Sequence, residues 1–215
     1  MSQAEESASE CPECGHLATL GDGDAWSALI CASCSRPFRA RPRKIVEKLR
    51  ARIGAASATL PDPATANQIC VIEDVRSGFN VGSILRSCDG IGWAHVCMVG
   101  ITGQATSKEV AKTALGAEQF VPSSYHLSSV ELLDSLAVRG YECVALEQRP
   151  DAIPLSGFSS GGPIALVVGN EVWGVSPEAL RRCARAVHIP MHGKKASLNV
   201  AVAFGIAAYA IKHAR

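Results

Sequence analysis

Four cysteines near the start of the chain limit most strongly what this sequence can fold into. Cys11 and Cys14, and then Cys31 and Cys34, are each separated by two residues, and sixteen residues lie between the two pairs. This spacing is typical of four thiolates that surround one Zn²⁺ ion in a tetrahedron. We therefore expect residues 11–38 to form a zinc ribbon. Four thiolates leave no open position on the metal, and so short a module cannot bury enough core to fold alone, so the zinc would be structural.

The other cysteines do not follow this pattern. They stand singly among apolar residues, as Cys70, Cys88, Cys97, Cys143 and Cys183. An odd total of nine cysteines argues against a disulfide framework. We expect these five to be small buried hydrophobic side chains.

Positive charge is concentrated just after the cysteine pairs. The whole chain of 215 residues carries a net charge of only +1, but residues 36–52 contain eight basic residues and a single acid. Within residues 39–54, Ile45, Leu49 and Ile53 recur every four residues, which predicts an amphipathic helix. A nearly neutral total therefore does not exclude a polyanionic partner.

Two interpretations of this basic helix stay open. The charged side of a helix is often simply exposed to solvent and binds no partner. A basic stripe beside a zinc module also suits contact with nucleic-acid phosphates, which requires charge and positioning more than base recognition. The candidates for phosphate contact are Arg41, Arg43, Lys44 and Lys48.

A change in composition divides the chain into parts. Residues 55–67 contain two prolines and mostly small residues, which is typical of a linker. We therefore expect a disordered tail over residues 1–10, the zinc ribbon over 11–38, a basic helix and linker over 39–66, and one larger domain over 67–215.

Short apolar runs alternate with helical segments in the larger domain. The expected strands are residues 69–72, 95–99, 141–146, 164–168 and 187–189. Helix starts are expected at Asn80, Thr106, Ser128 and Ser176, with a final helix over residues 198–213. Such alternation predicts an α/β fold with a mostly parallel sheet flanked by helices.

Several functional classes lack their sequence signatures. The chain has no glycine-rich dinucleotide fingerprint, no phosphate-binding loop, no zinc-protease helix and no nucleophile elbow. The longest apolar tract, residues 198–211, is shorter than the ~20 residues that span a bilayer. The acidic, polar start shows no secretory signal, so we expect a cytoplasmic protein without a membrane partner.

Three separated segments carry the residues best suited to chemistry. Residues 80–89 contain Asn80 and Arg86, residues 164–176 contain Glu171, and residues 189–203 contain Ser197 and Asn199. Taken singly, Asn80, Glu171, Ser197 and Asn199 are explained as helix caps.

Taken together, the three segments closely resemble the motifs of the SpoU-type (TrmH-like) RNA ribose 2′-O-methyltransferases of the SPOUT superfamily. Their order, spacing and strand-to-loop context all match, and residues 112–122 resemble the middle region of that family. The resemblance covers residues 67–215 and leaves out the zinc ribbon, which we take as an accessory RNA-binding extension.

The resemblance implies a fold and a cofactor. Members of the family have a parallel sheet with a deep trefoil knot near the C-terminus, bind S-adenosylmethionine in the loops of the knot and act as homodimers. Those loops correspond here to residues 168–174 and 189–199. The implied cofactor-binding residues are Gly169, Ile189, Leu198, Met191 and Glu147. A glycine at position 169 lets the backbone approach a ligand closely.

The resemblance also implies catalytic roles. Arg86 matches the essential arginine of the family, either as a general base or as a cation that stabilises developing charge; the first role is chemically awkward because a guanidinium holds its proton above pH ~12. Asn80 and Glu171 would orient Arg86, with Glu171 as the alternative base. Ser197 and Asn199 would hold the ribose, the cofactor or each other.

The expected activity is thus methyl transfer from S-adenosylmethionine to a ribose 2′-hydroxyl of structured RNA, either tRNA or rRNA. One alternative is a noncatalytic RNA-binding protein that retains the knotted scaffold and the zinc ribbon. Another is a DNA-binding regulator built on the zinc ribbon, which leaves the three motifs unexplained.

Overall fold

The computed structural model describes residues 8–21, 24–53 and 59–214. A seven-stranded sheet lies at its centre, in the order β7-β6-β5-β10-β8-β11-β9, and every pairing in it is parallel. Its strands are β5 (Gln68–Glu73), β6 (His95–Val99), β7 (Ser123–His126), β8 (Glu142–Leu146), β9 (Ile153–Pro154), β10 (Ile164–Val168) and β11 (Arg185–His188). The predicted parallel α/β fold is confirmed.

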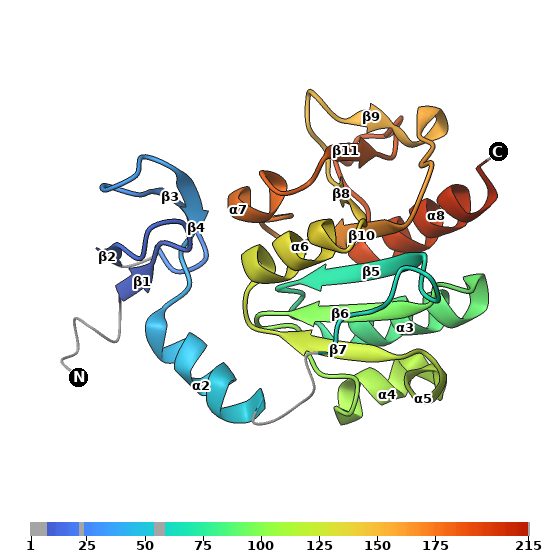
Figure 1. The fold of residues 1–215 in the computed structure, drawn as a ribbon, viewed down its shortest axis with the longest axis horizontal. Coiled ribbons are helices and arrows are strands. Elements are labelled where there is room, and N and C mark those ends of the chain that lie inside the picture. Colours follow the sequence, from blue (N-terminus) through green and yellow to red (C-terminus); the bar gives the residue numbers. More distant parts are fainter. Residues whose placement is uncertain (1–7, 22–23, 54–58, 215) are drawn as a thin grey trace.

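Helices cover both faces of this sheet (Figure 1). One face carries α3 (Gly78–Ile91), α4 (Lys108–Ala114), α5 (Ala117–Phe120) and α8 (Val200–His213), and the other carries α6 (Ser129–Val138) and α7 (Pro177–Leu180). Strand residues alternate between the two cores: Ile72 and Leu166 face α3 and α8, while Val71 and Val167 face α6. All of these strand residues are buried, which explains why the strands have continuous apolar runs.

The predicted strands match β5, β6, β8, β10 and β11 within two residues at each end. The sequence did not indicate β7 and β9, because β7 is a polar edge strand and β9 has only two residues. A short 3-10 helix, η1 (Leu155–Gly157), follows β9.

Serines cap most of the helices. Ser128 and Ser176 cap α6 and α7 as expected. The cap of α4 is Ser107, one residue after the predicted Thr106. Asn80 was expected to cap α3, but the hydroxyl of Ser77 does so by accepting a hydrogen bond from the Asn80 backbone amide. This leaves the Asn80 side chain available for other contacts.

Two small antiparallel hairpins form the N-terminal ribbon. They pair β1 (Ala8–Glu10) with β2 (Leu17–Thr19), and β3 (Ala28–Ile30) with β4 (Pro37–Arg39). Residues 8–10 are thus ordered, which corrects the predicted tail, because β1 runs into the first cysteine and pairs with β2. Residues 1–7 lie outside the described part of the chain. The basic helix is α2 (Arg43–Ile53), four residues shorter at its start than predicted.

The ribbon lies against the larger domain through buried ion pairs. The Arg41 guanidinium contacts the carboxylates of Glu73, Asp74 and Glu178, all three of which are fully buried. The carboxylate of Glu13 contacts Arg181 and Arg182 of the larger domain. The linker therefore does not leave the two parts independent of one another.

No helix within the described residues has the length and apolarity needed to cross a membrane.

Candidate active site

A pocket of about 250 Å³ opens where β8, β10 and β11 end. Parallel strands all point their carboxyl ends to the same edge of a sheet, and ligands of α/β proteins commonly bind there. The residues predicted to bind the cofactor all line this pocket: Gly169, Ile189, Leu198, Met191 and Glu147. The structure thus brings together five positions from three separate segments.

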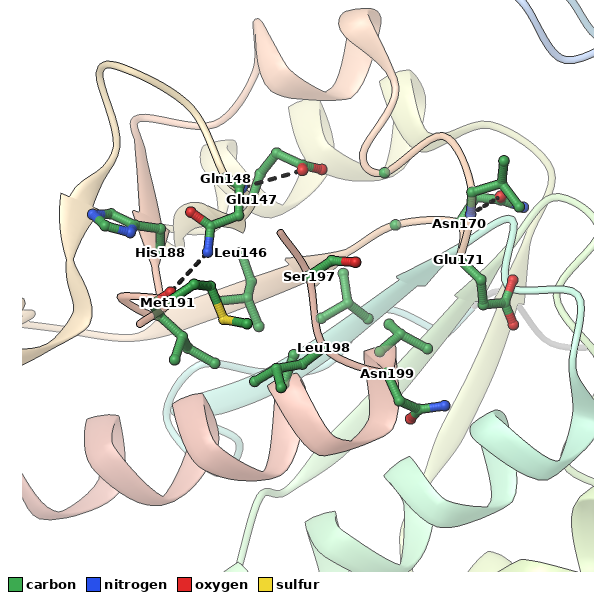
Figure 2. Close-up of a pocket in the computed structure, with 17 residues that line it drawn as sticks. Leu146, Glu147, Gln148, Asn170, Glu171, His188, Met191, Ser197, Leu198 and Asn199 are labelled. Atoms are coloured by element: carbon green, nitrogen blue, oxygen red, sulfur yellow. Dashed lines mark hydrogen bonds between the residues drawn. The ribbon is translucent and has the colours of Figure 1, made fainter. Parts of the chain in front are cut away.

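The pocket has a mixed lining of apolar and polar side chains. Figure 2 shows Leu146, Met191 and Leu198 on the side where Glu147, Gln148 and His188 also lie, and Glu171 and Asn199 on the other side. Such a lining suits a small molecule with apolar and hydrogen-bonding parts.

Three polar residues of the lining, Gln148, Asn170 and His188, were not predicted as site residues. The side-chain amide of Gln148 donates to the backbone carbonyl of Ile189 over 2.7 Å and so connects the end of β8 to the loop after β11. Its place beside Glu147, just beyond a predicted strand, is the only signal that could have indicated it.

A tight loop after β10 forms one wall of the pocket. The backbones of Asn170 and Gly174 exchange hydrogen bonds of 3.0 and 2.9 Å, and we call residues 170–174 loop 170–174. A Cβ atom on Gly169 would lie 2.1 Å from the carbonyl carbon of Gly174. The close approach of the protein's own backbone therefore requires glycine at position 169, and the close approach of a ligand to Gly169 stays a prediction.

Three predicted catalytic residues form one hydrogen-bonded row. Asn199 donates from its side-chain amide to Oδ1 of Asn80 over 3.0 Å, and Asn80 donates to Oε1 of Glu171 over 2.9 Å. Asn199 also caps α8. The row thus joins α3, loop 170–174 and the start of α8, which are far apart in the sequence.

The carboxylate of Glu171 is surrounded by donors. Partial burial raises its pKa, but the backbone amides of Arg76 and of Glu171 itself, then the Asn80 side chain and the Ser77 amide, outweigh this and hold the pKa below its ordinary value. A carboxylate with a lowered pKa and occupied oxygens is a weak proton acceptor. The geometry favours a positioning role for Glu171 over that of a base.

Arg86 does not join this row. It lies on α3 six residues after Asn80, about 120° around the helix axis. It lines a separate hollow together with Ser83, Ser87, Lys112, Thr113 and Leu115. The expectation that Asn80 and Glu171 orient Arg86 is therefore corrected, because their side chains bond to one another instead. Ser197 lines the pocket and is exposed to solvent.

The four N-terminal cysteines converge as a metal site requires. Their sulfur atoms all lie within 4.8 Å of one another, with Cys11 and Cys34 3.8 Å apart and Cys14 and Cys31 3.6 Å apart. Tetrahedral Zn²⁺ with Zn–S bonds of about 2.3 Å separates its sulfurs by roughly 3.8 Å, so the arrangement fits zinc.

The two halves of this cluster have the same backbone form. The amides of Gly15 and Ser35 donate to the carbonyls of Cys11 and Cys31, and both donors have positive φ angles. Each pair of cysteines thus lies on an equivalent tight turn.

The predicted phosphate contacts divide into two groups. Lys44 and Lys48 are exposed on α2, and Arg43 pairs with Glu47 one turn later. Arg41 precedes the helix and is engaged by three buried carboxylates. It is therefore not available for RNA, contrary to expectation.

The parallel sheet, the pocket at its carboxyl edge and the Asn199–Asn80–Glu171 row at the rim define an α/β domain of the RNA methyltransferase class. The chain belongs to the SpoU rRNA Methylase family, which it matches over residues 67–209.

Named relatives agree with this assignment. The tRNA (guanosine(18)-2′-O)-methyltransferase of Thermus thermophilus is 34% identical over 167 residues, which cover 78% of this chain and 79% of that protein. The crystal structure of the Aquifex aeolicus TrmH/SpoU tRNA modifying enzyme has a TM-score of 0.63 and 27% identity, over 79% of this chain and 82% of that one.

A third relative contains the cofactor. The SpoU methyltransferase AviRb from Streptomyces viridochromogenes, in complex with AdoMet, has a TM-score of 0.63 and 25% identity. The match covers 71% of this chain but only 60% of AviRb, less than two thirds of its length.

Proposed function

We propose that this protein transfers the methyl group of S-adenosylmethionine to a ribose 2′-hydroxyl of structured RNA, either tRNA or rRNA. One observation carries the proposal: the three sequence motifs form the Asn199–Asn80–Glu171 row, and the second and third motifs form, together with the end of β8, one cavity that contains all five cofactor positions. The relatives named above, two of them tRNA-modifying enzymes and one bound to AdoMet, support it.

The residues of the pocket fit the proposed cofactor. S-adenosylmethionine supplies an activated methyl group when it is bound. Ile189, Met191 and Leu198 offer apolar surface, while Glu147 and Gln148 offer polar atoms at the end of β8. The chain would mainly align the reacting groups, and good alignment alone lowers barriers by ~7–11 kcal/mol.

The row at the rim would position the ribose. Glu171 accepts a hydrogen bond from Asn80, and Asn80 in turn accepts one from Asn199, so the carboxylate holds Asn80 directly and Asn199 through it. Ser197 stands beside them and would share this task.

Arg86 would act on the substrate and not on the cofactor. It shares an open hollow with Lys112, so two positive charges face the solvent there. This favours contact with RNA phosphate or stabilisation of developing negative charge over transfer of a proton.

Two further parts of the proposal concern assembly. We propose that Cys11, Cys14, Cys31 and Cys34 hold one structural Zn²⁺ per chain, which the sulfur geometry supports. We also propose a homodimer. Val202, Ile206 and Tyr209 lie on one side of α8, each at least 43% exposed, and would be covered by a second copy.

The noncatalytic alternative is disfavoured, because the row and the cofactor positions are all intact. With these RNA substrates, the protein would act in the cytoplasm.

Mapping of 2′-O-methyl positions in total RNA, with and without this protein, tests the proposed function. At least one position in tRNA or rRNA should lose its methyl group in cells that lack the protein and regain it on complementation. Identical maps would contradict the proposal.

A further inference from the structure

The outer side of loop 170–174 is held by the zinc ribbon. The guanidinium of Arg39, the last residue of β4, donates to the backbone carbonyl of Trp173 over 2.7 Å and to that of Gly174 over 3.0 Å. Two parallel hydrogen bonds from one rigid fork fix the orientation of the acceptor as well as its distance. The ribbon thus binds the backbone of loop 170–174 directly.

Other contacts hold Arg39 itself in place. Its backbone amide donates to Oε2 of Glu178 over 2.9 Å, and only 4% of the residue is exposed. The adjacent Arg41 binds the other oxygen of Glu178. Trp26 of the ribbon stacks on Trp173, with ring centroids 6.3 Å apart. Arg39 is therefore buried and is held in place by contacts on both sides of the interface between the ribbon and the larger domain.

The inner side of the same loop forms the pocket wall. Asn170, Glu171, Val172 and Gly174 all line the cavity that holds the five cofactor positions. A shift of this five-residue loop would move the pocket wall and also the carboxylate that anchors Asn80. Arg39 therefore binds the outer side of the same short loop whose inner side lines the pocket.

We propose that Arg39 is a positioning residue for the cofactor site, and that the zinc ribbon holds loop 170–174 in the form that binds S-adenosylmethionine. The ribbon then has a second task besides any contact with RNA. This inference rests on the proposed function, because it takes the pocket to be the cofactor site.

Calorimetric titration of the full-length, zinc-loaded protein with S-adenosylmethionine tests this role. Arg39→Met removes both hydrogen bonds to the loop and keeps an apolar stem of similar reach. We expect its Kd for S-adenosylmethionine to rise about tenfold. Arg39→Lys keeps the charge but cannot reproduce the two parallel donors of the planar guanidinium, and it should raise the Kd about threefold.

Arg36→Met is the matched control. Arg36 lies three residues away in the same ribbon, its side chain is 58% exposed, and it pairs with Glu13 instead of the loop. This variant should bind S-adenosylmethionine as the wild type does. Zinc content and melting temperature are compared for all variants to identify any that fail to fold.

The kinetic parameters separate positioning from other roles. In Arg39→Met the KM for S-adenosylmethionine should rise and kcat should fall, because loop 170–174 also carries the Glu171 carboxylate that anchors Asn80, while the KM for RNA changes less than twofold. Wild-type cofactor affinity in folded Arg39 variants, or a loss confined to RNA affinity, would overturn the inference. A wild-type protein that binds no S-adenosylmethionine would instead overturn the proposed function, and with it this inference.

Discussion

At the scale of single residues, the backbone beside Gly169 leaves no room for a side chain. A Cβ atom at this position would meet atoms of Gly174 and Val175 at 2.1 to 2.3 Å, and they are all backbone atoms that cannot rotate away. Gly161 offers the opposite case, since no heavy atom lies within 4 Å of its Cβ position.

Gly169→Ala should therefore destabilise the protein by roughly 1–3 kcal/mol, the usual cost of overpacking, and should weaken cofactor binding. Gly161→Ala should leave both properties nearly unchanged. Urea denaturation and titration with S-adenosylmethionine measure the two effects. Equal stability of Gly169→Ala and Gly161→Ala would contradict a close approach of the Gly174 and Val175 backbone to position 169.

Arg86 provides the second prediction at this scale. It lies outside the cofactor pocket, so Arg86→Ala should abolish methyl transfer but keep the Kd for S-adenosylmethionine within a few-fold. Arg86→Lys should also fail, because an ammonium cannot reproduce the planar donor fork. Single-turnover assays with saturating cofactor measure the rate. Full activity in Arg86→Ala would remove this residue from the mechanism.

Residues with a family motif were predictable from the sequence, whereas Arg39 was not. Gly169, Ile189 and Leu198 were expected in one cofactor site, and the structure places all three in one pocket. Arg39 acts on backbone carbonyls that lie more than 130 residues away. A hydrogen bond to backbone leaves no pattern in the sequence of its acceptor, so no motif could indicate it.

At the scale of elements, α2 is the part of the ribbon region that is available to RNA. Lys44 and Lys48 are one turn apart and exposed, whereas Arg41 is taken up by buried carboxylates. The sequence showed the charge of residues 36–52 but not this division. The net charge of a segment includes every arginine in it. Only the tertiary structure shows which of these arginines already pair with carboxylates.

Replacing both Lys44 and Lys48 by Gln should weaken RNA binding without regard to sequence. The log–log dependence of affinity on salt should flatten by ~0.7–0.9 for each phosphate that the variant no longer neutralises. Removing Arg139 and Lys212, two cations of other helices, is the control and should change the slope less. An unchanged slope in the Lys44/Lys48 variant would mean that α2 merely faces the solvent.

The strands illustrate which elements the sequence could indicate. Buried central strands such as β5 and β10 have apolar runs and were predicted within a residue or two. The edge strand β7 (Ser123–His126) is polar, and its place is determined by pairing with β6. Such an element is specified by its neighbour and not by its own pattern.

At the scale of the whole molecule, the ribbon and the α/β domain are joined by charge. Arg41 lies among Glu73, Asp74 and Glu178, and Glu13 lies among arginines. Removing the ribbon should therefore destabilise the larger domain, since loss of Arg41 would leave three buried carboxylates without their cation. The C-terminal trefoil knot stays a prediction from the family resemblance.

Low pH should weaken the contact between the ribbon and the α/β domain. The pKa of Glu13 falls from an ordinary 4.5 to about 2, chiefly because Arg182, then Arg181 and Arg36, bind its carboxylate. A group whose pKa is lowered by folding stabilises the protein above its unfolded pKa, and the benefit is lost as pH falls through the folded value. Stability from Glu13 should therefore be complete above pH ~5 and decline down to about pH 2.

Glu13→Gln tests this pH dependence. It should lower the free energy of unfolding by roughly 1–2 kcal/mol at neutral pH, less than the full shift implies because solvent screens the arginines. The difference from wild type should shrink as the pH falls. Asp151→Asn, which breaks an exposed pair with Arg149, should have little effect. A pH-independent difference for Glu13→Gln would refute the electrostatic explanation.

The most direct test of the proposed methyl transfer is the chemical product of the purified protein. Full-length protein is incubated with methyl-labelled S-adenosylmethionine and unmodified tRNA or rRNA transcripts, which are then digested to nucleosides and analysed by mass spectrometry. We expect one labelled 2′-O-methylnucleoside with the wild type and none with Arg86→Ala. Absence of label with all transcripts, or label found on a base instead of the ribose, would contradict the proposed reaction.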